Sequence, residues 1–533
     1  MRFFSFLIIL VSFSNCHGPN RQEKKYKNES LSIQEAVLPD TSQILSGKAL
    51  AQTYCQACHA YPDPGLLDKT TWKRKVLPQM ALRLGLNPAG INPYLGKSTD
   101  EVYELMKAGI FPQKPYLPKK DWQRIEDFYV QQAPEKLALP AITELKSNTD
   151  NFSVIIPALH KGKQALTTLV KNEPDAKELW VGDLRNWVFR LDQSLKVIDS
   201  IRVDSPPVYI TKSKTNYKLV TIGSIIPTDK GVGSIYQVSA TAQPKLPQIL
   251  FNKLHRPVNV VEADLNQDKL IDLVVCNYGY NFGALMWYRN LGNGKYEPII
   301  LKSLPGARKT EIIDLNHDGQ LDIIALFAQG TETLKVFYNQ GGGAFEEQNI
   351  VQFPPVYGTN YFELVDFNKD GHLDIMIVNG DNADYSFALK PYHGIRILLN
   401  NGQNKFQEQY FYQMPGAWKA IARDFDQDGD IDIAAISYFP DFESAPQRGF
   451  IYLEQTGKFK FIASTFAQSP IGHWFTMEAA DYDQDGDEDI ILGSFTNTLT
   501  PVPPALQQKW MTSSPSILIL QNKRVLKPTI SLR

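Results

Sequence analysis

One acidic turn recurs five times from residue 264 onward, and it constrains the fold more than any other feature. Each copy carries aspartate or asparagine at its first, third and fifth positions and aspartate at its ninth. The copies begin at residues 264, 314, 366, 424 and 481, a spacing of 50 to 58 residues. A period of this length indicates that each repeat is one supersecondary unit stacked against its neighbours.

Each repeat also contains four short apolar segments separated by turns. In the first repeat, Val258–Ala263 runs into the acidic turn and Leu273–Cys276 leaves it. Leu285–Tyr288 carries aromatic residues, and Tyr296–Leu301 follows a turn of glycine and asparagine. Four strands in about 50 residues are typical of one blade of a β-propeller.

Two more blades, without the acidic turn, are expected ahead of these five. One includes Leu179–Gly182 and Trp187–Phe189, and the other includes Leu219–Ile222 and Ser234–Val238. The sequence therefore predicts an all-β propeller of seven blades over residues 150–533, with six or eight blades as the alternatives.

Two segments compete to close the ring. Asn151–Ile156 has the pattern of a fourth strand lying ahead of the first blade, and Val525–Leu532 is the second candidate. If Asn151–Ile156 pairs with the last blade, that blade combines strands from both ends of the domain and so closes the ring. The sequence alone leaves this choice open.

The recurring turn supplies the oxygen ligands that calcium prefers. Alternate side chains of a tight loop converge on one point, as in an EF-hand, but the closing aspartate at position nine excludes an EF-hand. Magnesium would demand a stricter octahedron, so we expect about five calcium ions, with a turn that binds nothing as the alternative. The expected ligands are Asp264, Asn266, Asp268, Asp272, Asp314, Asn316, Asp318, Asp322, Asp366, Asn368, Asp370, Asp374, Asp424, Asp426, Asp428, Asp432, Asp481, Asp483, Asp485 and Asp489.

These turns and their flanking strands resemble the FG-GAP or VCBS repeats of calcium-binding propellers such as integrin-like heads. The resemblance covers roughly residues 250–525 by motif and residues 150–533 by extension. It implies that the calcium is structural, because the ion pins the turn between inner strands and neutralises clustered acids.

A small all-α domain is expected over residues 46–137. Ser46 can cap a helix over Gly47–Cys58. Apolar residues follow helical spacing in Thr71–Leu84, which Pro78 interrupts, and again in Lys120–Gln132.

The sequence Cys55-Gln-Ala-Cys58-His59 is the attachment motif of a c-type haem. Two thiols three residues apart on a helical turn reach the two vinyl groups, and the adjacent histidine presents its imidazole to the iron. The alternatives are a redox-active cysteine pair or half a zinc site, but the chain contains no second pair of cysteines.

This region resembles the cytochrome c domains that bacterial proteins often carry fused to other modules. The matching segments are Cys55–His59, then Trp72 with Val76–Met80, then Asp121-Trp122 ahead of Tyr129. The resemblance implies that Met80 is the sixth ligand of the iron. Met106 is the other candidate, and the remaining alternative is an open iron beside a Met80 that only packs in the core.

The N-terminus has the pattern of an export signal. Met1-Arg2 precedes the apolar run Phe3–Phe13, which is too short to span a bilayer comfortably. Ser14-Asn15-Cys16 resembles the lipobox of bacterial lipoproteins, which implies that residues 1–16 are the signal and that Cys16 takes lipid. A plain secretory signal is the alternative. Polar residues 17–45 then serve as a tether.

Composition and cysteine content limit which partners, membrane segments and disulfides are expected. The formal net charge of −2 gives no bias toward nucleic acid, and no other apolar stretch is long enough for a transmembrane helix. Cys276 is the one cysteine left without lipid or haem, and we expect it to be a buried small hydrophobe rather than half of a disulfide.

A ring of cations and aromatics is expected at the mouth of the central channel, just ahead of the inner strands. As a hypothesis, it binds an anionic or sugar-like ligand or docks a partner, whereas ordinary packing of the channel mouth is the alternative. The expected residues are His255, Arg256, Arg308, Lys309, Trp418, Lys419, His473 and Trp474, with Asn360 and Tyr361 between them.

The leading interpretation is an electron-transfer lipoprotein on the periplasmic side of the outer membrane. The haem would shuttle one electron to or from a redox partner protein, and the propeller would act as scaffold or docking surface. One alternative is an oxidoreductase whose propeller holds the substrate, and another is a glycan- or protein-binding module. A fold resemblance alone does not decide between them.

Overall fold

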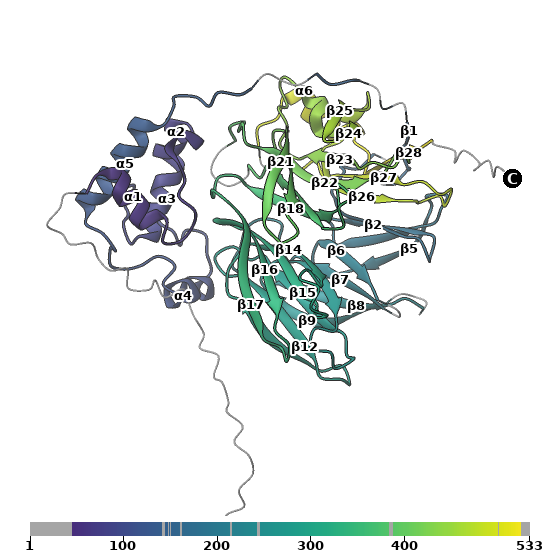
Figure 1. The fold of residues 1–533 in the computed structure, drawn as a ribbon, viewed down its shortest axis with the longest axis horizontal. Helices are drawn as coiled ribbons and strands as arrows, with labels where there is room; N and C mark the ends of the chain where they lie inside the picture. The colour runs from purple at the N-terminus through teal and green to yellow at the C-terminus, as the bar shows by residue number, and fades with distance from the viewer. Residues whose placement is uncertain are drawn as a thin grey trace, which may run out of the picture. The chain divides into compact units, whose positions relative to one another are not determined.

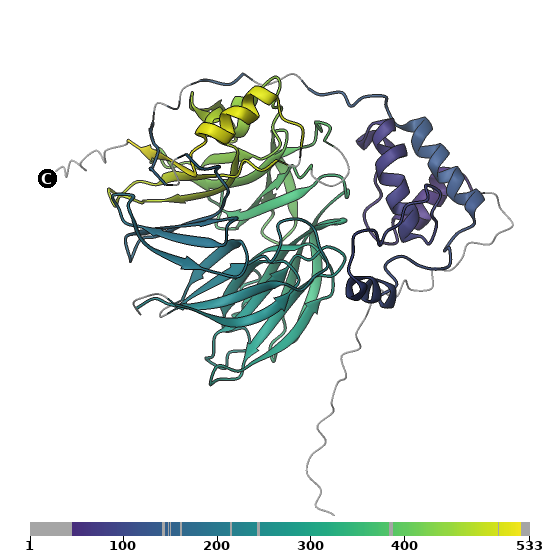
Figure 2. The ribbon, with the colours of Figure 1, turned by 180° about the vertical axis from the view of Figure 1, so that it is seen from behind.

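The computed structural model describes residues 45–140, 144–147, 149, 151–159, 162–213, 216–241, 246–382, 387–498 and 500–523. The predicted signal, Cys16 and most of the predicted tether lie outside these residues, as does Val525–Leu532. Residues 40–533 form one compact unit. Along this unit, helices come first and strands follow from residue 152 (Figures 1 and 2).

The described strands form seven antiparallel sheets of four, so the prediction of seven blades is confirmed. The first two blades are β2 Thr167–Glu173, β3 Glu178–Asp183, β4 Trp187–Leu191 and β5 Val197–Arg202, then β6 Pro207–Lys212, β7 Asn216–Thr221, β8 Gly233–Ser239 and β9 Pro247–Leu254. These are the two blades that lack the acidic turn.

The next four blades begin with the strand that enters the acidic turn. They are β10 Pro257–Ala263, β11 Asp272–Asn277, β12 Ala284–Asn290 and β13 Tyr296–Lys302; β14 Ala307–Ile313, β15 Asp322–Gln329, β16 Thr331–Asn339 and β17 Phe345–Phe353; β18 Thr359–Val365, β19 Asp374–Asn379, β20 Gly394–Asn400 and β21 Phe406–Gln413; and β22 Ala417–Arg423, β23 Asp432–Ser437, β24 Phe450–Gly457 and β25 Lys460–Ser464.

The last blade is built from both ends of the strand-containing region. It contains β26 Trp474–Ala480, β27 Asp489–Ser494 and β28 Ile517–Asn522, and its fourth strand is β1 Phe152–Ile155. Phe152 pairs with Asn522 in the antiparallel register of β1 and β28. The N-terminal candidate therefore supplies the closing strand.

The first strand of each blade lies innermost, and these strands contact one another around the ring until β26 meets β2. The second strands are the most deeply buried, because each has a neighbouring strand on both sides and packs against adjacent blades. All six residues of β11, β19, β23 and β27 are buried. An apolar second strand after each acidic turn is thus the main source of the core.

The helical part has its own core. Its elements are α1 Gly47–Cys55, the 3₁₀ turn η1 Pro64–Leu66, α2 Lys69–Thr71, the π-helical turn η2 Trp72–Val76, α3 Leu77–Arg83, α4 Thr99–Lys107 and α5 Lys119–Gln132. Trp72, Trp122, Ile125 and Tyr129 are at most 2% exposed and form the centre of this core.

Local sequence explains where these helices begin. The Ser46 hydroxyl accepts from the Ala49 N–H at the start of α1, as expected. Pro78 directly follows the π-helical turn η2, and the chain stays helical from residue 69 to 83, so the proline does not interrupt the helix, contrary to the prediction from the sequence. Gly47 is required by packing, because a Cβ there would lie 2.2 Å from the Arg124 carbonyl oxygen on α5.

Two helices lie where no helix was predicted. Helix α4 begins at a capping box in which Ser98 and Glu101 each bond the other's backbone N–H. Helix α6, Pro504–Ser513, lies between β27 and β28 along the chain. No helix among the described residues is long and apolar enough to cross a membrane.

Candidate functional site

The Cys-x-x-Cys-His motif lies where α1 ends. Cys55 is the last residue of the helix, and the Cys58 N–H bonds back to the Cys55 carbonyl at 3.4 Å. Cys55 packs against the helical core, whereas Cys58 is exposed. The turn therefore keeps the two thiols three residues apart at the edge of an apolar core.

The two thiols are not activated by their surroundings. Burial raises the pKa of Cys55 to about 11 and also raises the pKa of Cys58, although the nearby charge of Arg83 works against the second shift. A reactive dithiol needs a lowered thiol pKa, so this environment does not fit a redox-active pair. Cys55, Cys58 and Cys276, the cysteines in the described residues, are all free, and Cys276 is fully buried beside Thr310.

His59 is held in one tautomer. Its Nδ1 lies 2.9 Å from the Ala60 carbonyl oxygen, which can only accept, so Nδ1 carries the proton. Burial lowers the pKa of His59 and keeps the ring neutral. The Nε2 lone pair is then the one that remains for a metal, an arrangement typical of metal-binding histidines.

The two candidate methionines lie in different surroundings. Met80 packs against the same core cluster as Cys55, together with Tyr61 and Leu84. Met106 is 53% exposed on α4. The Tyr61 hydroxyl is buried in the same cluster, close to Tyr129. Two thiols and a neutral imidazole are the groups that covalent haem attachment requires.

The five acidic turns share one geometry. In each, the first aspartate accepts the N–H of the sixth residue at 2.8 to 3.2 Å. The sixth residue has a positive φ, which glycine provides in four turns and Lys269 adopts, with φ of 69°, in the first. A positive φ at this position is thus the conformational requirement of the turn, and glycine meets it most readily.

The ninth aspartates connect strands within each blade. All five are fully buried, and one oxygen of each accepts a backbone N–H from the third strand at 2.7 to 2.8 Å. Burial raises their pKa values, to about 7 for Asp432 and Asp489. These carboxylates therefore hold the blade together as well as facing the turn.

The turns fall into two classes. In the first three, the asparagine at position three donates to the aspartate at position five at 2.8 to 2.9 Å. The last two have aspartate at position three, and their first, third and fifth aspartates bring oxygens within 4.8 Å of one another. Oxygens gathered this closely repel unless a cation lies between them.

The last two turns also contain an acid that the sequence analysis missed. Asp430 and Asp487 stand at position seven, which continues the alternation of the other ligands. Asp487 is 3% exposed, and neither of its carboxylate oxygens has a hydrogen-bond partner. Burial, followed by the charge of Asp485, raises the pKa of Asp487 to about 6. These two turns are the strongest candidate cation sites in the described residues.

The predicted channel-mouth residues mostly contact the protein itself. Arg256 donates to three backbone carbonyls, and Lys419 donates to the Met477 carbonyl at 2.7 Å. His473 is buried between the rings of Tyr438 and Trp510. Of the others, His255 bonds the Asp229 carbonyl, Lys309 bonds Glu311 and the Phe362 carbonyl, and Trp474 lies in the core and bonds the Ser469 carbonyl.

Arg308 and Trp418 contact each other. The Arg308 guanidinium lies 4.8 Å from the Trp418 ring centroid, and its Nε donates to the Asn360 carbonyl. Both side chains are half-buried, as are those of His255, Lys309 and Lys419. Ligand binding by this set of residues therefore stays a prediction.

Acidic residues of the inner strands pair with the cations of the channel, which the sequence analysis did not foresee. Lys171 lies 2.6 Å from Glu478, Arg423 lies 2.8 Å from Glu363, and Lys309 pairs with Glu311. These pairs neutralise one another inside the ring, so the channel has no large excess of one sign of charge.

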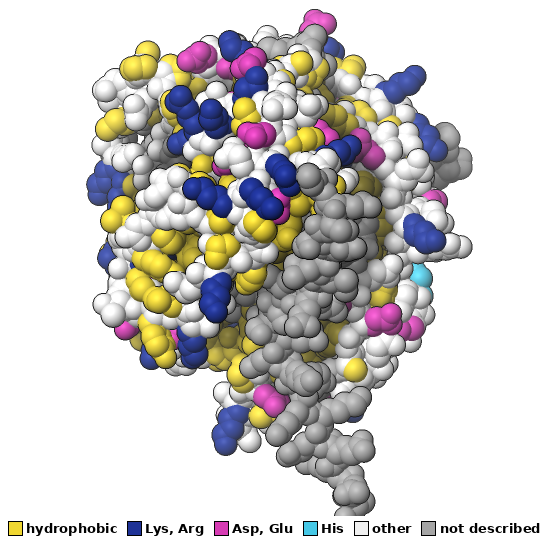
Figure 3. All heavy atoms as spheres, turned by 90° about the vertical axis from the view of Figure 1, so that its left-hand side faces the viewer, with side chains coloured by type: hydrophobic (Ala, Val, Ile, Leu, Met, Phe, Trp, Pro, Cys, Tyr) yellow, Lys and Arg dark blue, Asp and Glu magenta, His cyan; other side chains and the backbone are white. Residues whose placement is uncertain are grey.

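The helical part exposes basic side chains. Lys73, Arg74 and Lys75 form an exposed run in η2, and Lys and Arg side chains are spread over the face drawn in Figure 3. Such a surface favours partners with an acidic face.

Comparisons with known proteins support the repeats. Residues 264–325, 314–377 and 424–492 match the family described as FG-GAP-like repeat. No curated protein matches the chain. Among solved structures, Saccharomyces cerevisiae Sqt1 is 12% identical, with 67% of this chain and 84% of that chain covered at a TM-score of 0.39. The Neurospora crassa Pan2 WD40 domain is 10% identical, with 72% and 99% covered at a TM-score of 0.43.

Proposed function

We propose that this chain, which carries FG-GAP repeats on a seven-bladed propeller, is a haem-c electron-transfer lipoprotein whose propeller serves as a scaffold and docking surface. The observation that carries the proposal is the end of α1, where two unactivated thiols precede a neutral histidine with a free Nε2. This combination suits covalent haem attachment better than dithiol chemistry or zinc binding.

Each residue of the motif has a separate task. Cys55 and Cys58 would hold the haem through thioether bonds, and His59 would bind the iron through Nε2 while the Ala60 carbonyl orients its ring. Met80, which packs against the same helical core as Cys55, would provide the second protein ligand of the iron, and the Trp72–Tyr129 core would exclude water. The haem supplies a one-electron couple, and its methionine ligand raises the potential relative to a second histidine.

Calcium has a structural task in this proposal. About five ions would bind the acidic turns, with the last two turns preferred because each contains five aspartates. The cation would offset the repulsion between clustered carboxylates and so strengthen the link from each turn to the third strand of its blade.

The membrane anchor and the location belong to the same proposal. Cys16 would take lipid after removal of residues 1–15, which would tether the protein on the periplasmic side of the outer membrane. The redox partner would approach with an acidic surface, because the helical part exposes a basic run at residues 73–75.

Absorption spectra of the purified holoprotein test the haem proposal. We expect a weak band near 695 nm in the ferric protein, as methionine ligation produces, and no binding of carbon monoxide to the ferrous protein. Met80→Ala should abolish the band and admit carbon monoxide, whereas Met106→Ala should change neither. A protein without covalent haem, or a band lost with Met106→Ala instead, would contradict the assignment.

An oxidoreductase is the second candidate. It is favoured by Arg83, whose charge acts on Cys58 and whose guanidinium also bonds Asn281 of the propeller at 2.6 Å. A haem at Cys58 would then lie close to propeller residues, within range for electron transfer from a substrate held there. Carbon monoxide binding by the wild-type protein, together with turnover of an electron donor, would place this candidate first.

A further inference from the structure

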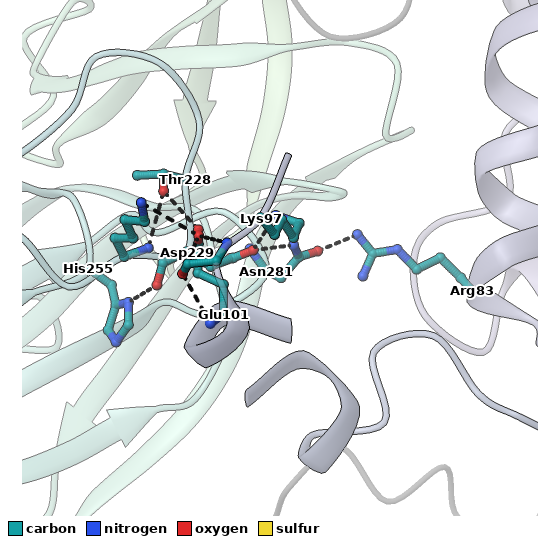
Figure 4. A network of polar contacts seen from close by, with 9 residues as sticks. Arg83, Lys97, Glu101, Thr228, Asp229, His255 and Asn281 are labelled. Carbon is teal, nitrogen blue, oxygen red and sulfur yellow. Dashed lines mark hydrogen bonds and ion pairs between the residues drawn. The ribbon is translucent and has the colours of Figure 1, made fainter. Parts of the chain in front are cut away.

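Asp229 is a buried carboxylate at the centre of a polar network that joins helical and propeller residues. It lies between β7 and β8, and its side chain has no exposed surface. Asn281, between β11 and β12, donates to it from its backbone N at 2.7 Å and from Nδ2 at 2.8 Å. Lys97, which precedes α4, approaches within 3.2 Å (Figure 4).

Further polar contacts surround this ion pair. Arg83 donates to Asn281 Oδ1 at 2.6 Å, and Thr228 donates to Glu101 at 3.2 Å. Lys230 lies 3.8 Å from Glu101, and the Lys97 ammonium lies 5.8 Å from the Tyr280 ring centroid. Apart from the Tyr280 ring and the methylene stems, the contacts of this network are charged or polar, as in interfaces that form and separate. A second, smaller contact joins the two parts, where the Tyr392 hydroxyl donates to the Leu66 carbonyl at 2.9 Å and Val356 packs against the helical core.

The propeller residues and the helical residues of the network would each keep their own hydrogen bonds if the two sets were separated. The Asp229 carboxylate retains both bonds from Asn281, and Glu101 retains the Ser98 N–H and hydroxyl, each at 3.0 Å. The Asp229 carbonyl also accepts from His255 within the propeller. Breaking this network would therefore expose these groups to water without leaving them unsatisfied, so the network itself adds little free-energy cost to separation.

We propose that the surface formed by Thr228, Asp229, Lys230 and Asn281 is a reversible docking site for the helical part of this chain, held by the Lys97–Asp229 ion pair. In the docked form Arg83 is fixed against the propeller through Asn281, and in the released form this hydrogen bond and the Lys97–Asp229 ion pair are broken. A role of the released form in electron transfer rests on the proposed function, whereas docking itself requires no haem.

Small-angle X-ray scattering of the full holoprotein, loaded with calcium, tests the proposal. The wild-type protein should be compact in about 10 mM NaCl and expand in about 1 M NaCl, where charges are screened within a few ångströms. Lys97→Ala should weaken docking about tenfold and so expand the protein already at low salt. Lys107→Ala removes an exposed lysine from the neighbouring α4 and should leave the wild-type behaviour unchanged.

Two results would overturn the proposal. One is a wild-type radius of gyration that does not respond to salt, and the other is a Lys97→Ala protein as compact as the wild type at low salt. Because Lys97 lies outside the propeller, the melting temperature of the propeller should not change in Lys97→Ala, which separates release from unfolding. A Cys55→Ser/Cys58→Ser protein should keep the salt response, so failure of the haem assignment is distinguished from failure of docking.

Discussion

At the scale of single residues, the sequence predicted candidate site residues, but it did not reveal which groups they contact in the fold. The spacing of Cys55, Cys58 and His59 indicates the haem motif, and the structure adds that Met80 packs against the helical core whereas Met106 is exposed. The channel-mouth residues show the limit of such reasoning, because His473 and Lys419 are engaged by groups far away in the sequence. Sequence position near a channel does not reveal whether a cation is already paired.

His473 should make the protein sensitive to acid. Burial lowers the pKa of His473 to about 4, below the value of about 6.5 in an unfolded chain. Its contribution to stability is therefore complete above about pH 6.5 and is lost as the pH falls toward 4.

Chemical denaturation at pH 7 and pH 4.5 measures this effect. Between these two pH values, the free energy of unfolding should fall by ~2 kcal/mol less in His473→Phe than in the wild type, since the phenyl ring stacks but does not titrate. His372→Gln, at an exposed histidine, is the control and should behave like the wild type. An unchanged pH dependence in His473→Phe would show that this histidine titrates normally.

At the scale of elements, periodicity predicted the strands well and the helices unevenly. The acidic turns and the apolar strands after them were found because five copies reinforce one another. Helix α4 was missed because its apolar residues at helical spacing, Val102, Leu105 and Met106, cover little more than one turn. The signal that could have found it is the capping box at Ser98 and Glu101. The acid at position seven was missed because only two of the five turns contain it.

Asp487 should both destabilise the calcium-free protein and tighten calcium binding. Asp487→Asn removes a buried charge that has no partner, so the calcium-free protein should gain stability. The same change removes a candidate ligand, and the affinity of one site should fall about tenfold. Gln320→Asn changes the equivalent position of the second turn and serves as the control.

Isothermal titration with calcium and thermal melting in a chelator give the two readouts for Asp487. Weaker calcium binding together with a higher melting temperature in the chelator would identify Asp487 as a ligand rather than a purely structural acid. Lower stability of Asp487→Asn in the chelator would mean that Asp487 makes a stabilising contact in the absence of metal, contrary to our expectation.

At the scale of the whole molecule, the ring is held by one pair of strands from distant parts of the chain. Phe152 of β1 is 6% exposed and packs against Phe425 and Tyr452 of the sixth blade. Sequence patterns predicted a strand here but left its pairing open, because two segments with similar patterns competed for the same edge. Long-range pairing of this kind depends on the geometry of all seven blades together.

Phe152→Ala should destabilise the pairing of β1 with β28 that closes the ring. Loss of a buried aromatic ring costs about 3 kcal/mol or more, and here it also loosens the strand that covers β28. Ile156→Ala, at a residue that is 47% exposed just beyond β1, should change stability little. Thermal melting of the calcium-loaded proteins compares them, and equal melting temperatures for the two variants would mean that β1 contributes little to closure.

The shared last blade also bears on how the protein is made. Strand β1 is synthesised before any blade, yet its partner β28 is among the last segments of the described chain to be made. A nascent chain therefore carries an unpaired β1 until β28 has been synthesised. Chains that stop before residue 517 lack the partner strand of β1 and cannot complete the seventh blade.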